Sequence, residues 1–361
     1  MKKTATTALK ILVSVGLYAY IFSKVDVEHL WSIVKEANIS NFVIAIIVYV
    51  IVQAISAYRW YLLLRPLGMR ISYPKVLSYY FLGMYFNFFL PTAIGGDVVR
   101  VYYLNKETKR LSASTASVFL DRDLGMAALL LMATIIATIG GTQFKGVPLA
   151  PIFGGIGIAF IAANLALFYR PTYNLLHRLL RVFKMKKADE KIERLFESVN
   201  VFRGEWTLLA GAMVISLVVQ VGCVFVNVLA ADSIGLHTAN GWIDFLVFIP
   251  AIGLISMVPI SLNGMGWREL SYLVLFQSVG ATESQGMTLA LMWLAILVVT
   301  ALPGGVIYIA RSLKGKEHSP KPEEVLEAES FNAQSIGPAR EDGKYSSLSG
   351  QPTEEEQAST I

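Results

Sequence analysis

Charged residues and cysteine are scarce in this sequence. Only 16% of the 361 residues are charged and 55% are hydrophobic, whereas an average soluble domain has about 25% and about 45–50%. This composition excludes a soluble enzyme and predicts a membrane protein. The single cysteine, Cys223, lies in the apolar run VVQVGCVFVNVLA, so an internal disulfide and a cysteine-based metal cluster are excluded and we expect a packing role.

Recognisable cofactor patterns are missing as well. The pattern G-x-x-x-x-G-K-[ST] of nucleotide-binding loops does not occur, and no metal-binding spacing is found. We therefore expect no cofactor and no metal. The formal charge of +5, from 31 basic and 26 acidic residues, is typical of basic cytoplasmic loops and does not indicate a nucleic-acid partner.

Long apolar runs are abundant, and they must form helices because backbone amides cannot stay unpaired in hydrocarbon. Six runs are predicted to cross the membrane, and five of them reach the length of about 20 residues that a crossing needs. The six cover residues 9–23, 41–64, 113–140, 150–169, 207–231 and 286–310. Two further runs, 76–90 and 243–258, also fall short of that length, and each ends at a proline followed by a glycine-containing turn. The sequence predicts an all-α polytopic transmembrane helical bundle.

The distribution of basic residues predicts how the short runs are placed. Lysines and arginines lie before residue 11, between 65 and 75, and between 100 and 110. Run 76–90 therefore leaves from and returns to the cytoplasmic side. The loops 232–241 and 281–285, around the second short run, contain no Lys or Arg. We expect two inverted re-entrant helical hairpins, with both termini on the cytoplasmic side of the inner cell membrane.

The chain divides into a transmembrane domain, residues 1–313, and a polar tail, residues 314–361. The tail is rich in Glu, Ser, Pro and Gly and is predicted to be a disordered cytoplasmic segment. Within the domain, nine basic residues lie between 170 and 203. They indicate either an amphipathic helix on the inner leaflet or a solvated basic loop.

The two expected hairpin turns share a pattern, LPTAIGGDVVR in the first and VPISLNGMGWRE in the second. In each, glycine follows proline by five residues and arginine follows it by nine: Pro91, Gly96 and Arg100, then Pro259, Gly264 and Arg268. Acids flank both arginines, Asp97 and Glu269. Such matched broken helices in two halves are typical of secondary transporters.

This pattern predicts an anion site where the two turns meet. Amides at the start of the outgoing helices attract anions, and guanidinium groups bind phosphate or carboxylate through two hydrogen bonds. The alternative is structural, with Arg100 and Arg268 bonding carbonyls freed at the turns. The cluster Asp121, Arg122 and Asp123 either lines the same cavity or flanks the headgroups.

Two other features are interpreted as structural. Arg59, next to Trp60, is expected to extend to the inner membrane interface and anchor its span. The sequence Pro303-Gly304-Gly305 is expected to kink the last span.

The strings RWYLLLRPLG, LPTAIGGDVVRVYYL, FLDRDLG, VPISLNGMGWRE and ALPGG make residues 5–313 resemble the lysylphosphatidylglycerol synthase transmembrane region, a flippase-like family. Carried over residue by residue, the matching positions are Gly95, Gly96, Asp97, Arg100, Asp121, Arg122, Gly264, Arg268 and Glu269. The resemblance implies movement of lipids or lipid-linked groups between leaflets. Members that synthesise the aminoacylated lipid carry a large soluble transferase domain, and only a short tail follows here, so synthase activity is not expected.

We therefore predict a lipid translocase that moves an anionic phospholipid or an isoprenoid-linked headgroup, alone or with a separate lipid-modifying enzyme. The driving force is left open among a lipid gradient, the membrane potential, and protons carried by Asp97, Glu269 or Asp121. The alternative is a membrane enzyme of lipid-linked sugar or aminoacyl transfer, in which Asp97 and Glu269 act as acid or base.

Overall fold

The computed structural model describes residues 26–88, 95–168, 200–258, 261 and 264–313, with scattered positions between Leu12 and Ser23. Several predictions fall outside these residues: the prolines of both turns, most of the basic stretch 170–203, the tail 314–361 and much of the span 9–23.

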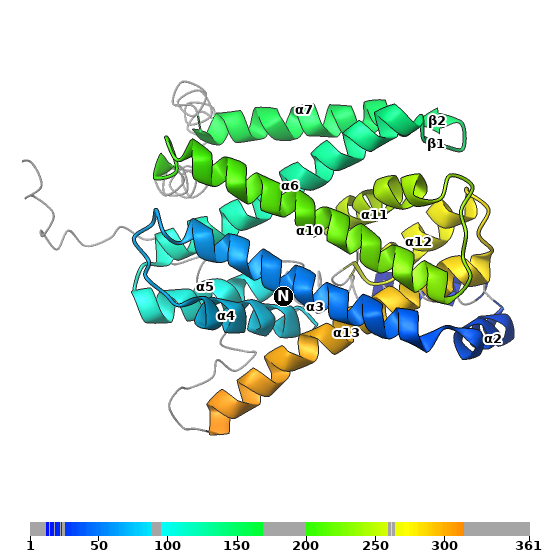
Figure 1. Cartoon of the computed structure of the whole chain (residues 1–361), viewed down its shortest axis with the longest axis horizontal. Helices are drawn as coiled ribbons and strands as arrows, with labels where there is room; N and C mark the ends of the chain where they lie inside the picture. Colours follow the sequence, from blue (N-terminus) through cyan, green and yellow to red (C-terminus); the bar gives the residue numbers. More distant parts are fainter. Residues whose placement is uncertain are drawn as a thin grey trace, which may run out of the picture.

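Four long helices make up the body of the molecule (Figure 1). They are α3 (Ile39–Leu63), α6 (Leu111–Gly140), α10 (Trp206–Ser233) and α13 (Glu283–Leu313). Each has at least 25 residues, or about 38 Å at 1.5 Å per residue, which exceeds the hydrocarbon thickness of about 30 Å. Four of the six predicted spans are thereby confirmed as helices long and apolar enough to cross a membrane.

The remaining helices are shorter. α7 (Leu149–Phe168) coincides with the expected span 150–169 and is linked to α6 by the two-stranded turn of β1 (Gln143–Phe144) and β2 (Val147–Pro148). α2 (Val27–Glu36) precedes α3. Its N-terminus is capped by Asp26, whose carboxylate accepts hydrogen bonds from the amides of Glu28 and His29.

The two predicted short elements are helical hairpins at opposite ends of the molecule, with their tips toward its middle (Figure 1). Hairpin 1 consists of α4 (Tyr73–Phe86) and α5 (Gly95–Thr108), and hairpin 2 consists of α11 (Trp242–Met257) and α12 (Trp267–Gln277). The all-α bundle is thus confirmed. Entry of these hairpins into a membrane stays a prediction.

The helix contacts place the hairpins against the long helices of the opposite half. α3 packs along α10, while α4 packs on α13 and α11 packs on α6. Where α4 and α13 meet, a side chain at Gly304 would collide with the carbonyl of Phe81. The glycines after Pro303 therefore allow α13 to approach hairpin 1 closely, and α13 is helical throughout.

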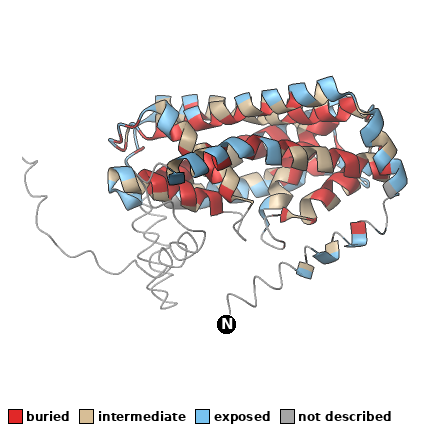
Figure 2. Ribbon diagram, turned by 90° about the horizontal axis from the view of Figure 1, so that it is seen from below, coloured by how far each residue is buried: buried red, intermediate tan, exposed pale blue. Residues whose placement is uncertain are grey.

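Buried residues lie where helices face one another, and exposed residues follow the outer faces (Figure 2). The exposed side chains include large aliphatic ones, such as Ile158 at 72%, Val214 at 61% and Val306 at 66%. An apolar outer surface of this kind is the surface that lipid covers.

Candidate functional site

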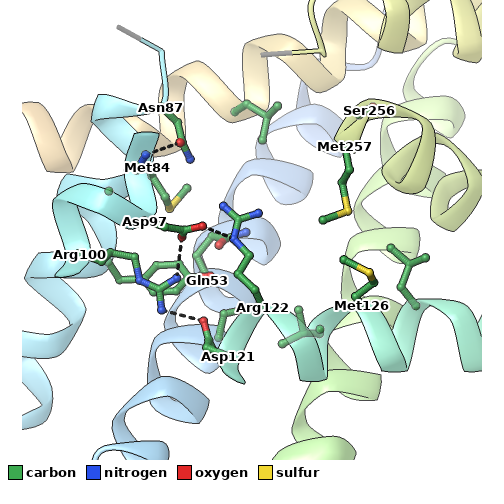
Figure 3. A pocket seen from close by; sticks show the side chains of 18 of the residues that line it. Gln53, Met84, Asn87, Asp97, Arg100, Asp121, Arg122, Met126, Ser256 and Met257 are labelled. Atoms are coloured by element: carbon green, nitrogen blue, oxygen red, sulfur yellow. Dashed lines mark hydrogen bonds and ion pairs between the residues drawn. The ribbon is translucent and has the colours of Figure 1, made fainter. Parts of the chain in front are cut away.

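A cavity of about 420 Å³ lies between the tips of the two hairpins. That volume is within the range of about 300–1,000 Å³ found for small-molecule sites. Hairpin 1 contributes Asn87 and Asp97 to its wall, and hairpin 2 contributes Ser256, Met257 and Arg268. Described residues near the ends of both hairpins thus line one cavity (Figure 3), while a direct meeting of the two turns stays a prediction.

Gly96 lies near the start of α5, where the two helices of hairpin 1 come close together. The amide of Gly96 donates a hydrogen bond to Oδ1 of Asn87 at 2.7 Å. A side chain at Gly96 would collide with the carbonyl oxygen of Gly83 on the facing helix. Gly96 is thus required for the close approach of α4 and α5. Gly95 begins α5, is buried, and does not line the cavity.

A chain of ion pairs runs through the hairpin 1 side of the cavity (Figure 3). Asp97 accepts hydrogen bonds from Nε of Arg122 at 2.6 Å and from Nη1 of Arg100 at 3.3 Å. Asp121 accepts hydrogen bonds from Nη2 of Arg100 at 2.7 Å and from Nε of Arg59 at 2.8 Å. The resulting order Arg59–Asp121–Arg100–Asp97–Arg122, called the ion chain below, joins α3, α5 and α6.

Arg100 is a buried member of the ion chain, with 5% of the residue exposed. Its guanidinium lies 4.1 Å from the ring centroid of Trp60 and 4.6 Å from that of Tyr80. These aromatic faces stabilise a cation that is removed from water. Together with two carboxylates they surround Arg100, so this arginine holds helices together.

The expected interfacial role of Arg59 is wrong. Arg59 is only 5% exposed, and its guanidinium donates hydrogen bonds to Asp121 and, through Nη1, to the hydroxyl of Ser216 at 2.7 Å. An arginine extends to the interface when no partner is near. Here Asp121, 62 residues along the chain, supplies one.

In hairpin 2, Arg268 is paired with the residue that follows it in the sequence, Glu269. Glu269 is fully buried and accepts hydrogen bonds from Arg268 at 2.6 and 3.0 Å and from the amide of Gly266 at 2.6 Å. Gly264 has φ +75°, and a side chain there would lie 3.0 Å from the carbonyl oxygen of Ser256. Glycine relieves strain at this turn. Arg268 faces the cavity, while Glu269 and Gly264 do not line it.

Six of the nine predicted site residues line the cavity: Gly96, Asp97, Arg100, Asp121, Arg122 and Arg268. Asp123, which the sequence grouped with Asp121 and Arg122, does not. Sequence reasoning missed four methionines in the wall, Met84, Met126, Met257 and Met265. The spacing of these methionines along the sequence does not indicate that they share a cavity. They give the cavity a flexible apolar side beside its charged one.

The cavity carries an excess of positive charge. Four arginines, Arg59, Arg100, Arg122 and Arg268, and two aspartates line it, and Glu269 lies behind Arg268. With every group ionised, this set has one net positive charge. A net cation away from water is costly unless an anion accompanies it. In the described part of the chain, no group of three or more His, Cys, Asp or Glu is arranged to hold a metal.

Comparison with known proteins places this architecture in a family. The family described as "Lysylphosphatidylglycerol synthase TM region" matches residues 7–304. The chain belongs to that family. Two relatives are a "UPF0104 membrane protein" of Archaeoglobus fulgidus, 28% identical over 84% of this chain and 96% of the relative, and a protein of Pyrococcus horikoshii with the same designation, 23% identical over 83% and 96%.

Family membership and the four long apolar helices make this chain a multi-pass membrane protein. The chain covers nearly the whole length of both relatives. The names of these two relatives state a membrane location and no activity.

Proposed function

We propose that this protein is a lipid translocase that moves an anionic phospholipid or an isoprenoid-linked headgroup between leaflets of the cell membrane. The observation that carries the proposal is the cavity between the hairpin tips, with its one net positive charge. A phosphate headgroup supplies the missing anion. The methionine side of the cavity suits the apolar chains that follow the headgroup.

The two halves support movement between faces because they follow one plan. A long helix, two short helices and a second long helix occur in each: α3 to α6, and α10 to α13. The hairpins point inward from opposite ends (Figure 1), and α4 packs on α13 as α11 packs on α6. We propose that these halves form an inverted repeat with re-entrant hairpins, so that rocking of one half opens the cavity to either leaflet in turn.

Two arginines are available to a headgroup. Arg122 is bonded to one oxygen of Asp97 and its side chain is 41% exposed. Arg268 has only the neighbouring Glu269 as its ion-pair partner among the described residues, and it faces the cavity. Both can turn toward a phosphate without leaving a buried acid fully unpaired, because Asp97 keeps Arg100 and Glu269 keeps the Gly266 amide.

For the orientation of the protein in the membrane, we propose the one that the distribution of basic loops predicts. The base of hairpin 1 and both termini face the cytoplasm, and the base of hairpin 2 faces outward. A separate lipid-modifying enzyme is a compatible partner on either face.

The test uses purified protein in phosphatidylcholine vesicles with fluorescent phosphatidylglycerol in both leaflets. A membrane-impermeant reductant bleaches only the outer leaflet, so loss of the inner-leaflet signal reports lipid movement. We expect movement without any added nucleotide. Arg268→Gln should slow it about tenfold or more, because a hydrogen bond to a charged group contributes about 1.5–3 kcal/mol.

Arg203→Gln is the matched control, because Arg203 is exposed and outside the cavity lining. It should move lipid at the rate of the unaltered protein. Equal rates for Arg268→Gln would remove that arginine from the site, and absence of movement in the unaltered protein would contradict the translocase. A chemically altered lipid, detected by mass spectrometry, would support the enzyme alternative.

A further inference from the structure

A glutamine lies near the middle of each of two equivalent long helices. Gln53 is the fifteenth residue of α3, and Gln220 is the fifteenth residue of α10. Each is the single glutamine of a helix that is apolar enough to cross a membrane. α3 and α10 also hold the same place in the two halves, because each is the long helix that precedes a hairpin. The glutamines are therefore a second pair of matched residues, beside Arg100 and Arg268.

The two glutamines lie close to the contact between α3 and α10. These helices pack along each other and run in opposite directions (Figure 1). A side chain at Gly222 of α10 would collide with Val52 of α3, so the two helices come close together there. Gln53 adjoins this contact on α3, and Gln220 adjoins it on α10. Both side chains line the cavity, so each half contributes one amide to its wall.

The amide of Gln53 is buried without a protein partner. The residue is 7% exposed and lines the cavity (Figure 3), and it makes no hydrogen bond to any other residue that the structure describes. Buried polar groups are otherwise paired in native proteins. Nε2 of Gln220 donates to the carbonyl of Gly125 on α6 at 3.1 Å, which uses one of the two N–H donors of that amide. The free amide of Gln53 therefore points to a ligand.

The chemistry of the cavity narrows the ligand. An amide and a hydroxyl are complementary, because each donates and accepts hydrogen bonds. An ammonium group is disfavoured, because the four arginines and two aspartates that line the cavity leave an excess of positive charge. The turn segments 89–94 and 259–263 contain no acidic residue that could offset this charge. A headgroup with a phosphate and hydroxyl groups suits both the arginines and the amides.

We propose that Gln53 and Gln220 form a hydroxyl-binding site, and that the lipid is a phosphodiester whose headgroup carries hydroxyl groups, as glycerol or a sugar does. The phosphate lies at Arg122 and Arg268, and the hydroxyls lie at the contact between α3 and α10. This inference rests on the proposed headgroup site and narrows its substrate. A lipid of the same charge without hydroxyls leaves the amides unpaired, which lowers its affinity.

Binding of short-chain lipids to the purified protein in detergent tests the site. Dihexanoyl phosphatidylglycerol and dihexanoyl phosphatidylethanol each carry one negative charge and differ in the hydroxyls of the headgroup. The rise in melting temperature with lipid concentration measures the affinity for each. We expect about fivefold tighter binding of the glycerol lipid, as for one hydrogen bond between neutral groups. A short-chain isoprenyl phosphoglucose is the third probe, and the hydroxylated lipid that binds more tightly identifies the headgroup.

Variants of the glutamines show whether these amides cause the preference. Gln53→Met and Gln220→Met keep the size of the side chain and remove its hydrogen bonds, so each should reduce the preference to less than about twofold. Gln277→Met is the matched control, because Gln277 is exposed and outside the cavity lining. It should keep the full preference. A Gln53→Met protein that is less stable but keeps the preference would make Gln53 a structural residue and overturn the proposal.

Equal affinity of the unaltered protein for the hydroxylated lipids and phosphatidylethanol, or binding of none of them, would also overturn the hydroxyl site. The lipid-movement assay separates this failure from failure of the proposed function. A preference that depends on Gln53, in a protein that moves no lipid, upholds the hydroxyl site and contradicts only the translocase. Lipid movement without the preference upholds the translocase and contradicts only the hydroxyl site.

Discussion

The two hairpins follow one plan but hold their arginines in opposite ways. In hairpin 1, Arg100 is bonded to acids on α5 and α6 and is covered by two aromatic rings. In hairpin 2, Arg268 is bonded to the residue that follows it, Glu269, and faces the cavity. Ion pairs therefore connect hairpin 1 to a neighbouring long helix, α6, whereas the arginine of hairpin 2 is paired within its own hairpin.

This difference teaches that matched positions in two halves need not have matched roles. The shared Pro-Gly-Arg spacing predicts two equivalent ligands. The structure instead makes Arg100 a link between helices and leaves Arg122, on the neighbouring α6, as the exposed arginine on that side. Variants in each half can break or sharpen this distinction.

The largest effect is expected from Asp121→Ala. It leaves Arg59 and Arg100 without a shared carboxylate in a buried setting, and breaking a buried pair costs about 3–5 kcal/mol. Glu269→Ala in hairpin 2 should cost less, because Arg268 can turn into the cavity. Thermal unfolding in detergent measures both, and a greater loss for Glu269→Ala would contradict the distinction.

Substitution of the turn glycines should give the next largest difference in stability between the two hairpins. Gly96→Ala sets a methyl group against the backbone of Gly83 and the side chain of Asn87, neither of which can move freely. Gly264→Ala introduces mainly left-handed backbone strain, about 1–2 kcal/mol. The melting temperature should fall further for Gly96→Ala. The reverse order would show that the tip of hairpin 1 is loosely closed.

The smallest effect on stability is expected from Arg122→Gln. Its side chain is 41% exposed, and the Asp97 that it releases keeps Arg100, so the cost should stay below about 1 kcal/mol, as for exposed ion pairs. Lipid movement should nevertheless slow, since one of the two available arginines is lost. A large drop in melting temperature with unchanged lipid movement would make Arg122 a structural residue like Arg100.

Sequence alone predicted the helical bundle, the two undersized elements and six of the residues that line the cavity, because proline, glycine and run length are local signals. It placed Arg59 wrongly, since the partner Asp121 is distant in sequence and close only after packing. The methionine lining was missed because the sequence shows only that these residues are apolar. Whether an apolar side chain faces a cavity or the helix contacts is determined by the fold.

The most direct test of the account is the sidedness of the two hairpin bases. In a Cys223→Ser background, Ser72→Cys places a thiol at the exposed base of hairpin 1, and Ser278→Cys places one at the exposed base of hairpin 2. Labelling with an impermeant maleimide in vesicles of known orientation should modify Ser72→Cys only from the cytoplasmic face and Ser278→Cys only from the opposite face. Modification of both from one face would contradict hairpins that enter from opposite sides to form a shared cavity.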